Sequence, residues 1–284
     1  MPVEDAVPFD HGGGLQALER PGPLVMGILN TTPDSFSDGG QWGSVDRAVA
    51  HAEQMLADGA HIIDIGGESS RPGAEPVSQD EELRRVIPVI EQLAGRCVMS
   101  IDTAKADVAD AALSAGAHIV NDITASLCEV AGAHRAGWIA MHMSGTPQTM
   151  QENPVYDDVV DDVIASLTDY SERGSAAGVT KLWVDPGIGF GKSTNHNLNL
   201  LREVKRLTRV GPELVIGVSR KRFVGQLHAI SDRIEGRETT PVDDRLEGSV
   251  LAAVWSWCKG ARTVRTHDVR SATIAARMIQ QTSS

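Results

Sequence analysis

The chain has 284 residues, is 41% hydrophobic and carries a formal net charge of −12 at pH 7. One large core is feasible, whereas the acidic balance and the lack of a basic run argue against nucleic acid as a partner. The apolar runs are well short of the roughly 20 residues that span a bilayer, and the first residues are acidic, unlike a secretory signal. We therefore expect no membrane partner and a cytosolic location.

Short apolar segments alternate with longer segments of helical spacing along the whole chain. This alternation favours parallel strands joined by right-handed crossovers. Eight regular units predict a single (β/α)8 TIM barrel over residues 24–284, with a doubly wound sheet as the alternative, and a partly ordered extension over residues 1–23. The predicted strands are Leu24–Leu29, Ile62–Ile65, Val98–Ile101, Ile119–Val120, Trp138–Met141, Leu182–Val184, Leu214–Val218 and Thr263–Val264. The predicted helices are Asp46–Asp58, Glu81–Leu93, Lys105–Ala115, Cys128–Arg135, Val155–Ala177, Leu198–Arg209, Arg245–Cys258 and Asp268–Gln281.

Three long connections are candidates for lids or binding loops, namely Asn30–Gly43, Gly66–Gln79 and His142–Pro154. A fourth stretch, Phe223–Asp244, contains Gly, Asp, Glu and Thr, and we expect an irregular excursion there. These loops follow predicted strands, so in a parallel barrel they lie at the end where ligands bind.

The cysteines and histidines form no metal motif. Cys97, Cys128 and Cys258 are too far apart for a paired site, and an odd number cannot pair completely, so we expect reduced, structural thiols. None of the nine histidines belongs to a His-Glu-x-x-His pattern or a Cys/His cluster. A dedicated zinc or iron site is therefore not expected.

The glycine-rich segment that follows Asp185 ends in Gly-Lys-Ser, as a nucleotide-binding loop does. Such a loop needs a glycine where Pro186 stands, and the glycines here do not form a dinucleotide fingerprint. What remains is an acidic residue at a strand end before a tight loop. Asp185 is thus a candidate ligand-binding residue, with a turn cap as the alternative interpretation.

Several other strand ends carry polar residues that suit a flat heterocycle. A carboxylate at Asp102 can accept two adjacent N–H groups, and the Asn121 amide both donates and accepts. For Asp102 alone, a helix cap is an almost equal alternative. Lys221, inside Ser219-Arg220-Lys221-Arg222, can donate to a ring carbonyl or nitrogen.

Two further strand ends suit an anion. Arg265 and His267 alternate to the same side if the last strand continues, and barrel phosphate sites commonly lie at the last loops. Asn30 ends the first strand and is a weak metal ligand alone. Mg²⁺ often takes one protein oxygen together with substrate phosphates, so a diphosphate would complete its shell.

Taken in order, these motifs resemble those of the dihydropteroate synthases from about Leu24 to the C-terminus. The resemblance rests on seven segments: Met26-Gly27-Ile28-Leu29-Asn30 with Pro33-Asp34-Ser35-Phe36-Ser37-Asp38-Gly39-Gly40, Asp64-Ile65-Gly66-Gly67-Glu68-Ser69 with Arg71-Pro72-Gly73, Ser100-Ile101-Asp102, Asn121-Asp122, Asp185-Pro186-Gly187, Ser219-Arg220-Lys221 and Arg265-Thr266-His267-Asp268-Val269.

The resemblance implies a transferase of folate biosynthesis that condenses 6-hydroxymethyl-7,8-dihydropterin diphosphate with 4-aminobenzoate. It implies Mg²⁺ as cofactor, homodimerisation through the late helices, and membership of a family that is a target of sulfonamides. Of the residues it assigns, we expect Lys221, Asp185 and Arg265 to be catalytic. The implied pterin contacts are Asp102, Asn121, Met143, Asp185 and Lys221; the diphosphate contacts are Asn30 with Mg²⁺, Arg265 and His267; the aminobenzoate contacts are Ser70, Arg71, Pro72, Phe190 and Ser219.

The chain departs from the family pattern at two positions near the aminobenzoate side. Ser70 stands where Thr is expected, and Ile188 replaces a usual Phe. Two alternatives are a noncatalytic pterin-binding paralogue and a methyltetrahydrofolate-binding methyltransferase domain. Both dispense with an anion site, so the basic groups at Lys221, Arg265 and His267 argue for the synthase.

Overall fold

The computed structural model describes residues 9–32, 40–71, 73–150, 154–232 and 238–282. Eight parallel strands close into one barrel in chain order, with β1 paired to both β2 and β8. The predicted fold class is therefore confirmed, and the doubly wound alternative is wrong. The strands are β1 Leu24–Asn30, β2 Ile62–Gly66, β3 Val98–Asp102, β4 Ile119–Asp122, β5 Gly137–Met141, β6 Lys181–Asp185, β7 Glu213–Gly217 and β8 Thr263–Thr266.

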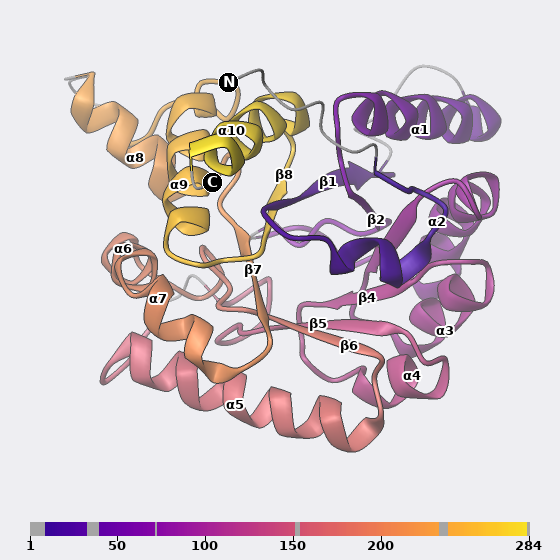
Figure 1. The fold of residues 1–284 in the computed structure, drawn as a ribbon, viewed down its shortest axis with the longest axis horizontal. Helices are drawn as coiled ribbons and strands as arrows, with labels where there is room; N and C mark the ends of the chain where they lie inside the picture. The colour runs from indigo at the N-terminus through magenta and orange to yellow at the C-terminus, as the bar shows by residue number, and fades with distance from the viewer. Residues whose placement is uncertain (1–8, 33–39, 72, 151–153, 233–237, 283–284) are drawn as a thin grey trace.

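Helices surround the barrel and follow its strands (Figure 1). They are η1 Gly14–Glu19, α1 Gly40–Ala57, α2 Gln79–Leu93, α3 Ala106–Ser114, α4 Cys128–Ala133, α5 Val159–Ala177, α6 Thr194–Arg202, α7 Val204–Leu207, η3 Thr208–Val210, α8 Arg222–Ser231, α9 Leu246–Cys258 and α10 Val269–Thr282. Among these described helices, none combines the length and apolar character that a membrane crossing requires.

Two predicted connections differ from the structure. The first part of the predicted excursion Phe223–Asp244 is helical, because helix α8 covers Arg222–Ser231 and buries Phe223 and Val224, whereas residues 238–244 are irregular as predicted. The helix predicted at Leu198–Arg209 begins earlier, at Thr194, where Ser193 caps it by accepting from the His196 N–H. That helix is also divided into α6, α7 and the 3-10 turn η3.

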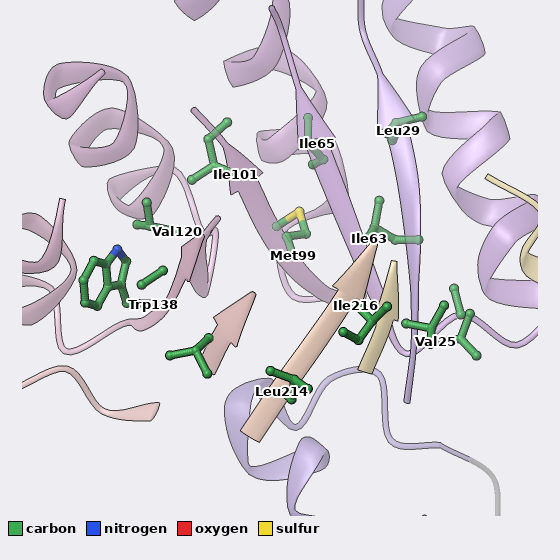
Figure 2. Close-up of a cluster of buried hydrophobic side chains, with 14 of the residues drawn as sticks. Val25, Leu29, Ile63, Ile65, Met99, Ile101, Val120, Trp138, Leu214 and Ile216 are labelled. Carbon is green, nitrogen blue, oxygen red and sulfur yellow. The ribbon is translucent and has the colours of Figure 1, made fainter. Parts of the chain in front are cut away.

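Strand alternation divides the side chains into two layers. Those that point outward pack with the helices in one cluster, which Figure 2 shows from Val25 on β1 to Ile216 on β7. Those that point inward at the amino ends of the strands form a second cluster that includes Met26, Val98 and Trp183. The same alternation decides which residues farther along each strand face the barrel axis.

The segment before β1 closes the amino end of the barrel. Leu18 of η1 is fully buried within the inner cluster. Arg262 donates to the Leu18 carbonyl oxygen at 3.1 Å, and Lys181 donates to the Glu19 carboxylate at 2.8 Å. The ring of His61 accepts from the Val25 N–H at 3.0 Å, and burial lowers its pKa to about 4. Ligands must therefore enter at the opposite, carboxyl end.

The three cysteines are free; Cys97 and Cys128 are buried, while Cys258 is exposed.

Candidate active site at the carboxyl end of the barrel

At the carboxyl ends of most strands, the side chains that face the barrel axis are polar and no longer apolar. The register pairs Gly66 with Asp102, Asp102 with Asn121, and Gly217 with Arg265. Residues that are far apart in the chain are therefore neighbours at one barrel mouth. The row comprises Asn30, Asp64, Asp102, Asn121, Asp185, Ser219, Arg265 and His267.

Arg265 joins two carboxylates at the centre of this mouth. Its Nε donates to Asp64 Oδ2 at 2.5 Å, and its Nη2 donates to Asp102 Oδ2. Burial raises the pKa of Asp102, while the guanidinium opposes that shift; the two carboxylates raise the pKa of Arg265 in spite of its burial. The sequence analysis places Arg265 on the diphosphate side, whereas in the structure its guanidinium contacts the carboxylates of Asp64 and Asp102. Its contact with a diphosphate stays a prediction.

Asp64 is a site residue that the sequence analysis did not assign a role. It is fully buried, and its Oδ2 also accepts from Asn121 Nδ2 at 3.1 Å. Its other oxygen, Oδ1, has no hydrogen-bond partner in the structure. A buried carboxylate oxygen without a partner is costly, so Asp64 Oδ1 is an unsatisfied acceptor within the mouth.

The side chains of the neighbouring residues Asn121 and Asp122 point in opposite directions and have different partners. Asp122 faces the helix layer, where it accepts from the N–H groups of Thr124, Ser126 and Leu127 and from Trp138 Nε1. Those donors saturate its carboxylate, so it organises the turn into α4. Asn121 alone faces the barrel axis.

Asp185 ends β6 and starts the glycine-rich loop before α6. Its Oδ1 accepts from the Gly187 N–H at 2.7 Å, so the turn-cap interpretation describes one of its two oxygens. The carboxyl is buried, and burial raises its pKa while Lys221 opposes the shift. Asp185 therefore holds the loop and still contributes a carboxylate to the mouth.

Lys221 follows β7, and its side chain packs against this glycine-rich loop. Its Nζ donates to the Ile188 carbonyl oxygen and stands 4.5 Å from the centroid of the Phe190 ring. Gly189 makes room, because a Cβ there would be 2.8 Å from Lys221 Cδ. Burial lowers the pKa of Lys221 to about 8, with Asp185 opposing the shift. The mouth thus contains an ammonium group above an aromatic face, a pairing that suits a planar ligand.

Ser219 and His267 are bonded to each other. The backbone N–H of His267 donates to Ser219 Oγ at 3.2 Å, and Oγ is 3.1 Å from His267 Nδ1. The hydrogen bond between Oγ and Nδ1 runs in the direction that the ring tautomer sets, and a ring that accepts at Nδ1 carries its proton on Nε2. Burial, followed by Arg265, lowers the pKa of His267 to about 3. A neutral ring with an N–H donor results. A contact of Ser219 with aminobenzoate stays a prediction.

Ser70, Arg71 and Met143 lie on the loops that follow β2 and β5. Ser70 is partly exposed and Arg71 exposed on the β2–α2 loop, and the charge of Arg71 contributes to the lowered pKa of His267. Met143 is half-buried after β5. Pro72, and the segment 33–39 of the first predicted loop, lie outside the described residues.

Lys192, from the Gly-Lys-Ser sequence, has no role in the sequence analysis, and its side chain is buried within the loop after β6. Its Nζ donates to the Phe190 carbonyl oxygen and lies near His142 Nδ1, both at 2.9 Å. Burial lowers the pKa of Lys192 to about 7. The lysine therefore ties the loops after β5 and β6 together. Its only distinguishing feature in the sequence is the Gly-Lys-Ser pattern, which does not form a nucleotide-binding motif here.

Candidate metal ligands do not cluster among the described residues. In the parts of the chain that the structure describes, no group of three or more His, Cys, Asp or Glu side chains is placed to hold a metal ion. Asn30 is partly exposed at the end of β1, beside Gly66 of β2. Its amide oxygen can supply one ligand to a hard cation, and the described residues around it add no cluster of ligands.

Taken together, a closed parallel barrel with a buried carboxylate–guanidinium–amide network and a lysine over an aromatic ring defines a pterin-binding type of enzyme. The family model described as "Pterin binding enzyme" matches residues 26–267. The dihydropteroate synthase of Escherichia coli K12 is 43% identical over 277 residues, which cover 94% of each chain.

Solved structures agree with this sequence match. The dihydropteroate synthase of Yersinia pestis in a sulfonamide drug complex has a TM-score of 0.83 at 43% identity, covering 92% of this chain and 94% of its own. The enzyme of Xanthomonas albilineans with 4-aminobenzoic acid has a TM-score of 0.83 at 41% identity, covering 94% of both. The chain belongs to the dihydropteroate synthase family.

Proposed function

We propose that this chain condenses 6-hydroxymethyl-7,8-dihydropterin diphosphate with 4-aminobenzoate to give 7,8-dihydropteroate and diphosphate. The observation that carries the proposal is the convergence of Asp64, Asp102, Asn121, Asp185 and Lys221 at one barrel mouth, in a chain of this family. Carboxylates accept from the amino and ring N–H groups of a pterin, while the Asn121 amide reads its carbonyl edge.

The reaction breaks the bond between the exocyclic pterin carbon and the diphosphate oxygen, and forms a bond from that carbon to the arylamine nitrogen. The amine proton leaves to solvent. Positive charge develops on the pterin as diphosphate departs, and the carboxylates Asp102 and Asp185 are placed to stabilise it. We expect the neutral ring of His267 to contact the departing diphosphate. Positioning and electrostatics therefore carry most of the catalysis.

Mg²⁺ fits this donor set. Asn30 offers one uncharged oxygen, and the described residues provide no closed cage, which matches a hard cation that takes its other ligands from diphosphate and water. Bound Mg²⁺ would neutralise charge on the leaving group. Removal of the metal with EDTA is expected to abolish turnover, and added Mg²⁺ is expected to restore it.

A homodimer through the late helices is part of the proposal. Helix α9 packs between α8 and α10, and these helices expose Ile230, Leu251, Trp255, Ile274 and Met278. Large exposed apolar side chains on adjoining helices are typical of a protein interface. We expect sedimentation to give twice the monomer mass, and Leu251→Glu to shift the protein toward monomer.

The test of the function is direct. Purified protein with Mg²⁺ and both substrates is expected to release diphosphate and form dihydropteroate, and sulfonamides are expected to compete with aminobenzoate. Lys221→Met should lower kcat/KM by roughly 10²–10³. Arg222→Met is the matched control, because that neighbouring side chain is exposed and pairs with Glu238. A parent protein that forms no product, while it still binds the pterin, would instead indicate a binding paralogue.

A further inference from the structure

Lys105 forms an ion-pair clamp beside the mouth that the proposed chemistry does not use. Its Nζ contacts Glu68 on the β2–α2 loop and Glu82 on α2. The Glu82 side chain is fully buried, whereas those of Lys105 and Glu68 are 26% and 29% exposed. Lys105 is therefore the cation that compensates a buried carboxylate while it also holds a loop residue.

Glu68 closes the base of that loop. Its Oε1 accepts from the Val77 N–H at 3.3 Å, across nine residues. Arg85 on α2 donates to the Gly67 carbonyl oxygen at 2.8 Å, and Gly67 sits so close to α2 that a Cβ would be 2.8 Å from Val86. Only the base of the loop is fixed by these contacts, and its tip carries Ser70 and Arg71.

The clamp starts from the turn that carries the pterin-facing carboxylate. Lys105 follows Asp102 by three residues, and its N–H donates to Thr103 Oγ1 at 3.2 Å. The Thr103 N–H in turn donates to the Asn121 carbonyl oxygen at 3.2 Å. One rigid turn after β3 therefore supports both the pterin-facing group and the anchor of the β2–α2 loop.

We propose that Lys105 is a positioning residue for the arylamine substrate: its pairing with Glu68 holds the β2–α2 loop over the mouth and so sets the affinity for aminobenzoate. The inference rests on the proposed function. Lys105 contacts the loop through Glu68 and touches none of the residues assigned to the pterin. Loss of the clamp should therefore affect the second substrate and spare the first.

Two variants separate this role from folding. Glu68→Gln keeps an acceptor for the Val77 N–H, removes the charge that Lys105 attracts, and leaves the Lys105–Glu82 pair intact. Lys105→Met alone would strand the buried Glu82 carboxylate, which also raises the pKa of Asp102. The double variant Lys105→Met/Glu82→Gln removes both charges together and avoids that defect.

Both variants are expected to raise the KM for aminobenzoate about tenfold, which corresponds to about 1.4 kcal/mol. The Kd for the pterin diphosphate and kcat at saturation should stay within about twofold of the parent. Arg96→Met, which removes an exposed pair with Glu53 at the far end of α2, is the control and should change neither constant.

An unchanged KM for aminobenzoate in both variants would overturn the inference, as would an equal loss in pterin affinity. Hydrogen exchange without substrates supplies an independent readout, because loss of the clamp should speed exchange of amides in the 67–78 segment. A parent that makes no dihydropteroate would refute the proposed function, and unchanged exchange would separately refute the clamp.

Discussion

Substitution of Arg265 tests whether the mouth depends on charge pairing inside the barrel. Arg265→Met removes the guanidinium that contacts Asp64 and Asp102. Asp64 is fully buried and the Asp102 side chain is 11% exposed, so water cannot replace the lost partner well. Removal of one side of a buried pair costs about 3–5 kcal/mol, and we expect a loss of unfolding free energy in that range.

A second substitution tests the cause of that loss. Asp64→Asn keeps an oxygen that accepts from Asn121 and removes the stranded charge. The double variant Arg265→Met/Asp64→Asn should therefore be more stable than Arg265→Met by about 1–2 kcal/mol, since part of the penalty is uncompensated charge. The loss of unfolding free energy in Arg265→Met should also shrink as the pH falls. A carboxyl whose pKa is raised in the folded state destabilises the fold at a pH where the unfolded chain is ionised, and this cost decreases as the pH falls below the raised pKa.

The assay is urea unfolding of the parent and both variants at pH 7 and pH 5. The midpoint should move while the slope stays constant, because the surface exposed on unfolding is the same. A loss below about 1 kcal/mol in Arg265→Met, or a double variant no more stable than the single one, would refute the reasoning.

Three further predictions address other parts of the molecule. Asp122→Asn should cost about 3 kcal/mol of stability, because several buried donors lose a charged acceptor, yet the pterin Kd of the folded variant should not change. Leu18→Ala should cost about 2–5 kcal/mol in urea unfolding with both KM values unchanged, since Leu18 closes the opposite barrel end; altered KM values would contradict this division. His61, His142 and His267 have folded pKa values lowered to about 4, 3 and 3, so their stability contribution is complete above pH 6.5 and is lost as the pH falls toward those values. Each should cost about 2 kcal/mol at pH 5, and an NMR titration in which these rings of the folded protein are protonated at pH 5 would argue against neutral buried rings.

The sequence was sufficient to predict the barrel, because strand and helix periods differ and alternate throughout. It was also sufficient to place Asp102, Asn121, Asp185 and Arg265 at one end, since parallel strands share their carboxyl edge. Asp64 lacked a role because it lies inside an apolar strand and not at its end. A charged residue within such a strand is itself a signal, since charges are seldom buried without a partner.

Helix α8 was missed for a local reason. Gly225 interrupts its helical pattern, and glycine inside a helix ordinarily disfavours it. The structure shows why glycine is used: a Cβ would lie 2.3 Å from Thr239 Oγ1 and 2.4 Å from Arg245 Nε. This close packing depends on residues that follow much later in the chain, so local propensity could not reveal it.

The three cations after β7 also show what sequence adjacency leaves open. Arg220 has a positive φ of 57° and donates to Asp268, whereas Arg222 is exposed and pairs with Glu238. Of the three, only Lys221 packs its side chain against the loop after β6, beside Phe190. The cluster therefore contributes one positive charge to the mouth and not three.

The charge balance of the mouth bears on the proposed Mg²⁺ dependence. Among the described inward-facing residues, the mouth holds the carboxyl groups of Asp64, Asp102 and Asp185 beside the two cations Lys221 and Arg265. Burial raises the pKa of Asp102 to about 7, and His267, whose pKa is lowered to about 3, is neutral at pH 7. Both cations already contact carboxylates or a carbonyl oxygen. A diphosphate substrate thus meets inward-facing cations that are already engaged, with the exposed Arg71 as a further guanidinium near His267, and a divalent cation carried in with the substrate would add to this compensation. The electrostatics of the barrel, independently of the Asn30 ligand, therefore favour the Mg²⁺ dependence proposed above.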